Sequence, residues 1–461
     1  MTGLPFQPVL LWSDALLFVL IAAIVALTVW ARRQDAMRAA WSRVARDGMA
    51  MAAATVLAVF VLVGLLDSLH YRARLEAQPG AATRYAVEVN SVLDALLSDL
   101  RQRAEKTYSA PLATHLYSKE ALENSMQREF PRLKHGGAHL GADLANHEVD
   151  IAVRVSRGIA GGLALWLLLV AVVRRQNGLD LKAVLKVGVD GTAMGPVLLT
   201  LLAVFVLLGA AISLAGGYHV FGTDKVGQDV LYLSLKAIRT GLLIGTLTTL
   251  VMLPVAVLLG ILAGYVGGWV DDVIQYLYTT LSSIPGVLLI AAAVLMMQVV
   301  IDTHPDWFAT SAERADARLL ALCLILGMTS WTGVARLLRG ETLKLRELEF
   351  VQAAQAFGVG RFAIMRRHIL PNLMHIVLIA LVMDFSGLVL AEAVLSYVGV
   401  GVDPSTISFG TMINTARMEL AREPMVWWSL LAAFGFMFVL VLAANLFADA
   451  VRDAFDPRSS A

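Results

Sequence analysis

Residues 350–372 read FVQAAQAFGVGRFAIMRRHILPN and form a polar, basic segment between two long apolar runs. One run ends near Leu338 and the other begins near Leu373, so both ends of the segment are tied to the membrane. An excess of Lys and Arg is typical of short cytoplasmic loops, and the segment is therefore predicted to lie in the cytoplasm. The basic residues are Arg336, Arg339, Lys344, Arg346, Arg361, Arg366 and Arg367.

The segment itself predicts two short helices separated by glycine. Residues 351–357 contain good helix formers with small side chains, and Gly358 and Gly360 then end the helix. A second helix is expected over residues 362–370, with Pro371 stopping it. A helix pair with a small-residue face and a basic flank is suited to dock into a groove on a partner protein. An ordinary loop is the alternative interpretation.

The composition indicates a multispanning membrane protein. Apolar residues make up 58% of the 461 residues, and the mean hydropathy of +0.70 is too high for a soluble chain. The formal net charge is only +1, which does not favour nucleic acid as a partner. The single cysteine, Cys323, lies in an apolar run, so the sequence predicts neither a disulfide framework nor a cysteine metal site.

Nine apolar runs are predicted to span the membrane, which needs about 20 apolar residues. The last six agree with that length within the usual tolerance for tilt, whereas residues 159–173 form a short span flanked by Arg157, Arg174 and Arg175. The arginine cluster between Arg32 and Arg46 follows the first run and predicts an outside amino terminus. Nine crossings then put residues 350–372 and the carboxyl tail in the cytoplasm. The runs are residues 15–31, 49–66, 159–173, 196–215, 240–263, 285–300, 319–338, 376–395 and 427–447.

These runs predict an all-α polytopic fold in four parts. Residues 1–66 hold two spans and a basic cytoplasmic loop, and residues 158–193 hold a third extra span and a cytoplasmic linker. Between them, residues 67–157 are polar, mixed in charge and helically periodic in places, which predicts a small extracytoplasmic helical domain. Residues 194–461 form a six-span core that contains the segment 350–372.

The segment resembles the EAA loop of the permease subunits of bacterial ABC importers. That pattern is Glu-Ala-Ala, a spaced glycine, an apolar run and a Leu-Pro ending. Gln352 stands in the position of the family's glutamate, which keeps the shape but removes the charge. The matching residues are Ala353, Ala354, Gly358, His368, Ile369, Leu370, Pro371 and Asn372.

Further stretches between about residues 194 and 458 resemble the C-type subunit of the dipeptide/oligopeptide/nickel family. Residues 221–230, FGTDKVGQDV, resemble its GTDxxGRD element, with Gln228 in the arginine position. Roughly the first 190 residues are not part of the usual pattern. The other landmarks are residues 263–268, Trp331 with Ala335 and Arg336, residues 390–393, residues 395–401 and the tail 449–458.

The resemblance implies a permease subunit of an ATP-driven importer that moves peptides or related small solutes inward. It also implies a second permease subunit, cytoplasmic ATPase subunits and an extracytoplasmic solute-binding protein as partners within the lipid bilayer of the cytoplasmic membrane. The sequence contains no GxxxxGK[ST], HExxH, GxSxG or CxxC, so we predict no catalytic residue and no cofactor, with ATP hydrolysis on another subunit. The implied coupling residues are Gln352, Ala353, Ala354, Gly358, His368, Leu370 and Pro371.

Two acidic residues, Asp384 and Glu392, interrupt the apolar run 376–395. A charged carboxylate inside a membrane costs at least about 2.5 kcal/mol by insertion scales, so it tends to face a partner or a cavity. Both are therefore candidates for the translocation path. The alternative is a carboxylate hydrogen-bonded to neighbouring backbone or to an arginine, and for Glu392 the two interpretations stay equally open.

Four residues of the extracytoplasmic segment, His135, His139, Asp143 and His147, recur every four positions. On a helix they would form a drifting stripe of metal-capable side chains. Glycines at 136, 137 and 141 weaken such a helix, so a solvated polar face is favoured and no metal site is predicted.

A second class of function is a membrane receptor or scaffold. In that case the extracytoplasmic domain senses a ligand and the cytoplasmic loop binds a signalling partner. Co-elution with an ATPase subunit would separate the two classes.

Overall fold

The computed structural model describes residues 6–31, 33, 35–75, 84–121, 128–141, 144–177 and 193–455. Outside them lie Asp143, the linker 178–192 with Lys182 and Lys186, and the end of the tail from Asp456. The chain divides into two compact units, which are described separately. The first comprises residues 1–10, 34–240 and 407–450, and the second comprises residues 11–33, 241–406 and 451–461.

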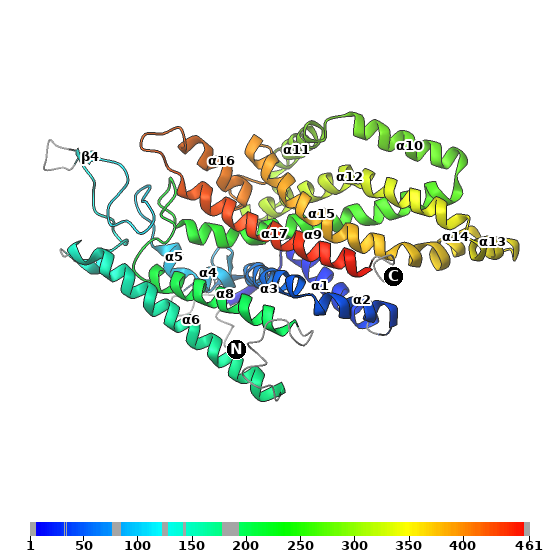
Figure 1. The fold of residues 1–461 in the computed structure, drawn as a ribbon. Coiled ribbons are helices and arrows are strands. Elements are labelled where there is room, and N and C mark those ends of the chain that lie inside the picture. The colour runs from blue at the N-terminus through cyan, green and yellow to red at the C-terminus, as the bar shows by residue number, and fades with distance from the viewer. Residues whose placement is uncertain are drawn as a thin grey trace. The chain divides into compact units, whose positions relative to one another are not determined.

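Long helices dominate both units (Figure 1). Every predicted apolar run coincides with one of them, which confirms the all-α polytopic class. In the described part of the chain, eight helices are long and apolar enough to cross a membrane. The helix α1 (Trp12–Ala31) carries a shorter apolar stretch. The count of nine crossings stays a prediction. The eight are α3 (Gly48–Ser68), α6 (His147–Asn177), α8 (Met194–Ala215), α9 (Val230–Val266), α11 (Gly286–Thr303), α12 (Ser311–Arg346), α15 (Leu370–Val398) and α17 (Trp428–Phe455).

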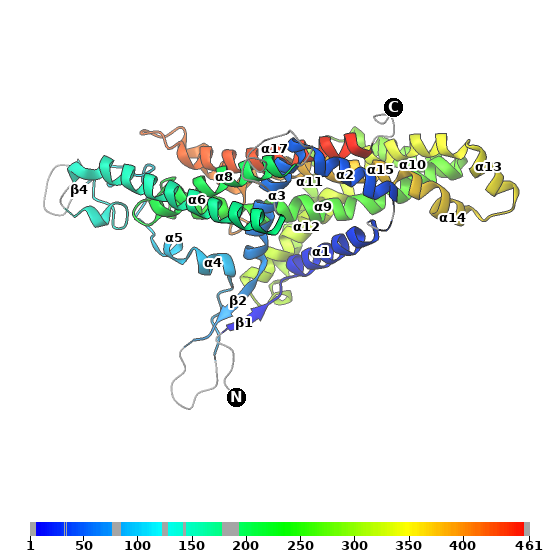
Figure 2. The ribbon, with the colours of Figure 1, turned by 60° about the horizontal axis from the view of Figure 1, so that its bottom comes forward.

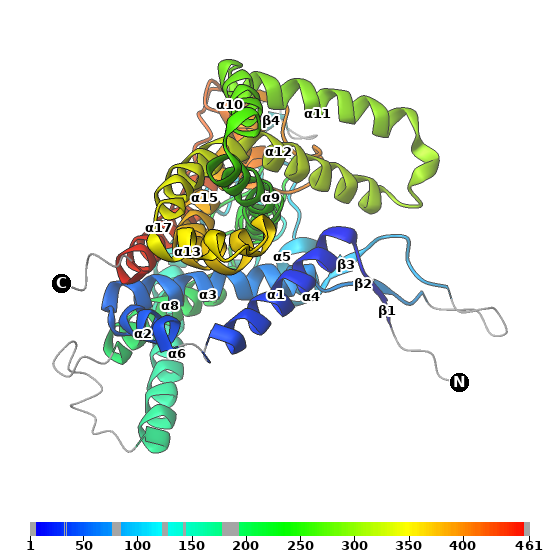
Figure 3. The same ribbon diagram turned by 90° about the vertical axis from the view of Figure 1, so that its right-hand side faces the viewer.

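Shorter helices connect the long ones. The turn before α10 (Gly268–Ser283) uses Gly267 and Gly268 at φ of 67° and 56°, a backbone conformation that suits glycine. In the second unit α11 and α12 run side by side, joined through η3 (Pro305–Trp307) (Figure 3). The remaining short helices are α2 (Asp35–Arg46), α13 (Glu349–Ala356), α14 (Arg361–Ile364), the π-helical turn η4 (Met365–Ile369) and α16 (Phe409–Glu419).

In the first unit α6 and α8 pack antiparallel with their backbones in close contact (Figure 2). A Cβ atom added to Gly158 would lie 2.4 Å from the carbonyl oxygen of Gly209, and one added to Gly162 would lie 2.3 Å from that of Phe205. The indole Nε1 of Trp166 donates a hydrogen bond to the Leu198 carbonyl at 2.7 Å. Small residues thus let these helices approach as closely as membrane helices do at glycine contacts.

The polar segment after α3 is less helical than predicted. Its described residues hold two five-residue helices, α4 (Val92–Leu96) and α5 (Ser98–Gln102), with turns at η1 (Ala138–Leu140) and η2 (Leu144–Asn146). The remaining elements are strands: β1 (Phe6–Val9), β2 (His70–Ala73) and β3 (Asn90–Ser91) form one antiparallel sheet, and β4 (Glu120–Ala121) pairs with β5 (Arg128–Glu129).

The backbone partners of this segment explain why long helices do not form. Some of its backbone groups bond the loop between α8 and α9, and others pair with distant parts of the segment itself, as Leu116 N does with Pro131 O. Glu105 N donates to Gly227 O at 2.9 Å, and Leu112 N donates to His219 O at 2.9 Å. Leucine periodicity cannot report such long-range pairing, because it records only which side chains share a face.

A buried charged group joins the same two segments. The His219 ring lies 2.7 Å from the Asp229 carboxylate through Nδ1 and 3.4 Å from that of Glu105 through Nε2, and all three side chains are about 3% exposed. Burial disfavours the His219 imidazolium, but hydrogen bonds to Asp229 and Glu105 outweigh that effect and raise its pKa to about 9. The polar segment is therefore held to the core by an ion pair as well as by backbone bonds.

The close contact between α6 and α8 predicts that one glycine variant lowers the stability of the protein and that a neighbouring one does not. Gly158→Leu must push the helices apart, because its side chain would meet the backbone of Gly209, and overpacking of this kind costs about 1–3 kcal/mol. Gly161→Leu is the matched control, since a Cβ there has nothing within 4 Å. Thermal unfolding of the purified protein should show a lowered midpoint for Gly158→Leu alone. Equal midpoints for the two variants would contradict the close contact.

Candidate functional site

The inner face of the segment 350–372 is fixed to the membrane helices. Val351, Ile364 and Ile369 are fully buried in a cluster with the ends of α9, α10 and α12. In the same region α9 and α12 approach closely, since a Cβ on Gly264 would lie 2.6 Å from Thr342 Cβ. The segment therefore belongs to the packed core of the second unit, and α13 lies at one end of that unit (Figures 1 and 2).

The turn after α13 has the hydrogen-bond pattern of a glycine-dependent helix end. Gly358 N donates to Gln355 O at 2.9 Å, and Val359 N donates to Ala354 O at 3.1 Å, which together form a Schellman motif. Gly358 has a φ of 75°, a left-handed conformation that suits glycine, and it ends the helix as predicted. Gly360, at φ −59°, is an ordinary cap for α14.

The outer face of this turn exposes large aromatic side chains. Phe357 is 87% exposed and Phe362 is 70% exposed, on either side of Gly358. Gln352 and Ala353 are also exposed on α13. Sequence reasoning missed both phenylalanines because it followed small residues and charges. An aromatic on each side of a glycine turn in a polar loop is the signal that would have found them.

Pro371 does not stop the second helix, and that prediction was wrong. The chain continues from α14 through the π-helical turn η4 into α15, where Pro371 is in the first turn. A proline is tolerated there because the wider π-helical turn just before it relieves the clash that usually ends a helix. Asn372 Nδ2 donates a hydrogen bond to the carbonyl of His368 at 2.6 Å.

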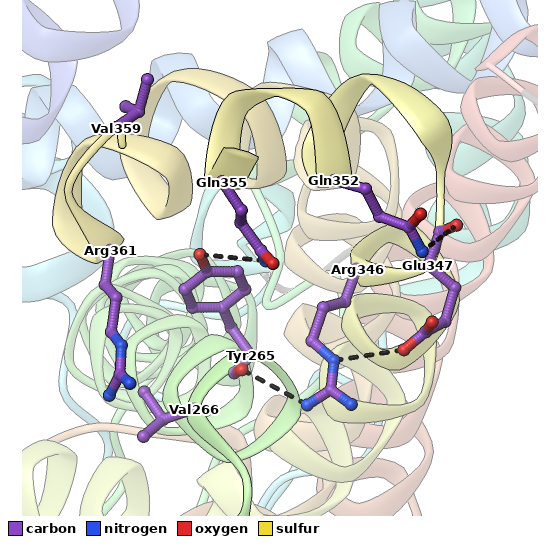
Figure 4. Close-up of a pocket in the computed structure, with 8 residues that line it drawn as sticks. All are labelled: Tyr265, Val266, Arg346, Glu347, Gln352, Gln355, Val359 and Arg361. Carbon is purple, nitrogen blue, oxygen red and sulfur yellow. Dashed lines mark hydrogen bonds and ion pairs between the residues drawn. The ribbon is translucent and has the colours of Figure 1, made fainter. Parts of the chain in front are cut away.

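A pocket of about 690 Å³ lies beneath α13, between it and the ends of α9 and α12 (Figure 4). Gln352 Nε2 donates to the Glu347 carbonyl at 3.2 Å, and Gln355 Nε2 donates to the Tyr265 hydroxyl at 3.3 Å. Arg361 points toward Val266 at the opposite side. The lining residues are Tyr265, Val266, Arg346, Glu347, Gln352, Gln355, Val359 and Arg361.

The Gln352 contact uses a group that the family's glutamate lacks. An amide nitrogen can donate to a backbone carbonyl, whereas an ionised carboxylate can only accept. This bond joins α13 to the residue that follows α12, and the acidic partner of Arg346 among the described residues is the exposed Glu347, at 3.3 Å. His368 has a packing role, with its ring 6.2 Å from that of Phe350, and Leu370 is half-buried in the same cluster.

The two acidic residues of α15 have different surroundings. Glu392 is 1% exposed, and its Oε1 accepts a hydrogen bond from Ser396 Oγ at 2.7 Å. The Oδ2 atom of Asp384 is buried and has no hydrogen-bond partner among the described residues. A separation of eight residues puts them about 12 Å apart along the helix, so they do not form one site.

The histidine series is likewise not brought together. His139 Nε2 pairs with Asp150 Oδ2 at 2.8 Å, whereas His147 Nε2 lies 2.9 Å from the Leu112 carbonyl. His135 contributes its backbone N–H to Glu105. Over the described residues, no group of three metal-capable side chains could hold an ion.

Known proteins resemble the carboxyl-terminal half of the chain. Residues 256–461 match the family model of the binding-protein-dependent transport system inner membrane component. The oligopeptide transport system permease protein OppC of Mycobacterium tuberculosis strain H37Rv is 31% identical over 244 residues, 53% of this chain and 77% of that one.

Two other relatives are similar over the same part. The dipeptide transport system permease protein DppC of Lactococcus lactis is 31% identical over 52% of this chain and 64% of its own length. The glutathione transport system permease protein GsiD of Pectobacterium atrosepticum is 31% identical over 52% of this chain and 73% of its own. Together with the multispanning fold, these matches show that the chain belongs to the binding-protein-dependent transport system inner membrane components, as a multi-pass permease subunit of an ABC importer whose ATPase is a separate subunit.

Proposed function

We propose that this permease carries peptides or related small solutes into the cell, and that residues 350–372 couple it to the ATPase. The relatives' names, which include oligopeptide, dipeptide and glutathione permeases, support the substrate class. A second permease subunit and an extracytoplasmic solute-binding protein complete the proposed assembly. The receptor or scaffold alternative is not favoured, because these relatives are all transport permeases.

The two faces of the α13–α14 pair carry the coupling proposal. Its outer face exposes Phe357 and Phe362, and aromatic side chains of this kind act as anchors in protein interfaces. Its inner face is packed through Val351 and Ile364 against the ends of membrane helices. Movement of a partner bound at the outer face would therefore displace those helices, because a packed core transmits displacement rather than absorbing it.

Gly358→Arg is expected to abolish uptake and to weaken binding of the ATPase subunit. The left-handed conformation costs a residue with a Cβ about 1–2 kcal/mol, and the charged side chain would stand between the two exposed phenylalanines. A matched control is Gly141→Arg, since Gly141 also has a positive φ and open space around it but lies in the polar segment. Uptake, membrane abundance and ATPase co-purification should be measured for both variants.

Normal uptake by Gly358→Arg, or an equal loss in Gly141→Arg, would contradict the coupling assignment. If Gly358→Arg does not accumulate in the membrane, Ala353→Arg tests the same face without a backbone change, because Ala353 is exposed on α13. Normal uptake by that variant would count against the proposal in the same way.

We also propose nine crossings with an outside amino terminus. Exposed probes are available on each side: Val87 is 81% exposed in the polar segment, and the Lys344 side chain is 70% exposed near α13. In a Cys323→Ala background, an impermeant thiol reagent should label Val87→Cys in intact spheroplasts and Lys344→Cys only after permeabilisation. The reverse pattern would rule out this orientation.

Asp384 is the stronger of the two proposed path residues, because its buried Oδ2 atom has no partner among the described residues. Asp384→Asn should lower uptake about tenfold or more, the effect of about 1.4 kcal/mol, without changing ATPase binding. Glu392→Gln serves as comparison and should change uptake much less, since an amide oxygen still accepts from Ser396. Similar uptake by both variants would remove the reason for separating the two residues.

A further inference from the structure

The helix α2 is held at one end to the membrane boundary by its connection to α3. Only Asp47 separates the end of α2 at Arg46 from the start of α3 at Gly48, and the Asp47 side chain caps α3 by accepting from the amides of Met49 and Ala50. Because α3 is long and apolar enough to span the membrane, α2 must lie where α3 leaves it. The short connection therefore fixes the Arg46 end of α2 at that boundary, and the buried Ala40 and Val44 show that one side of α2 is covered by other residues.

The start of α8 and the end of α6 lie at the same end of the first unit as α2. A Cβ on Gly48 would lie 2.9 Å from Pro196, so α3 and α8 begin side by side. The Gly158–Gly209 and Gly162–Phe205 contacts set an antiparallel register, which places Arg174 of α6 beside the start of α8. The start of α3, the start of α8 and the end of α6 therefore share one membrane boundary with α2.

Arginine side chains gather at this boundary, and no acidic partner pairs with them among the described residues. Ala40 and Val44 are the buried side of α2, and the arginines lie on its other sides, all exposed. In the described part of the chain, none of these guanidinium groups has an ion pair or hydrogen bond. We name the set the basic rim. It comprises Arg38, Arg43, Arg46, Arg174 and Arg175.

The surroundings of the basic rim identify its occupant. Trp41, 39% exposed, flanks the buried side of α2, and tryptophan at this depth is typical of the headgroup region. The outer faces of α6 and α8 below it expose Leu165, Leu168 and Leu207, which suits acyl chains. Arginines one or two residues from a membrane span attract anionic headgroups, each contributing about 1 kcal/mol, or about fivefold, near the surface.

We propose that the basic rim is a binding site for anionic phospholipid headgroups, in the cytoplasmic leaflet if the proposed orientation holds. The headgroup phosphates would accept hydrogen bonds from Arg38, Arg43 and Arg46, while Trp41 anchors α2 at the interface. The additional amino-terminal helices would in this way attach the permease to a shell of acidic lipid. This role does not depend on the coupling or transport assignments.

The proposal is tested with the full chain reconstituted in phosphatidylcholine bilayers containing trace spin-labelled phosphatidylglycerol or spin-labelled phosphatidylcholine. Electron paramagnetic resonance measures the fraction of each lipid held by the protein. We expect wild type to hold phosphatidylglycerol several-fold more strongly than phosphatidylcholine at low ionic strength, and less so in high salt. The triple variant Arg38→Gln, Arg43→Gln, Arg46→Gln should lose most of this preference.

A charge-matched control removes three exposed cations elsewhere, as Lys119→Gln, Arg128→Gln, Lys134→Gln, and should keep the wild-type preference. If the triple variant does not fold, Ala39→Glu with Ala45→Glu places acid on the exposed sides of α2 and should reduce the preference as well. An unchanged preference in either α2 variant, or no preference in wild type, would overturn the proposal. An equal loss in the control variant would show only a net-charge effect and would also overturn it.

Discussion

A segment that passes motion from one protein to another must be held rigidly on one face and remain open on the other. The α13–α14 pair satisfies both conditions, because Val351 and Ile364 are buried among membrane helices while Phe357 projects almost entirely into solvent. The sharp reversal between the two helices is made by Gly358, whose conformation only glycine adopts without strain. The proposed coupling therefore depends on one backbone turn more than on any individual contact.

Close backbone approach holds the membrane helices of each unit together. Lipid is as apolar as leucine, so apolar burial gives little drive for helices to associate, and small residues that permit dense packing take over that role. Gly158 and Gly162 serve this purpose between α6 and α8, and Gly260 and Gly264 do so between α9 and α12. The second pair lies next to the cluster that holds α13, so the helices receiving the proposed motion are also tightly packed.

Much of the fold could be predicted from the sequence because the membrane imposes one rule on every span. Each apolar run became a helix, as it must where water cannot satisfy backbone groups. Outside the membrane that rule fails. The polar segment bonds the loop that contains Gly227 and His219, and no periodicity within the segment reveals a partner more than a hundred residues away. Pro371 was misjudged for a related reason, since a π-helical turn just before it removes the conflict that usually ends a helix.

The candidate site shows the same division between local and long-range information. Gly358 was predictable because its requirement is local, whereas Phe357 and Phe362 could be recognised only after the structure showed which side chains remain exposed.

The contact made by Gln352 also depends on the structure. The Gln352 amide donates to the Glu347 carbonyl, a bond that the family's carboxylate could not make, and the change leaves the pocket beneath α13 with two arginines, Arg346 and Arg361, and one exposed acid. Electrostatic complementarity selects among partners more than it adds affinity. In the proposed coupling, an uncharged side chain at position 352 would suit an ATPase with a more acidic docking groove than a glutamate would.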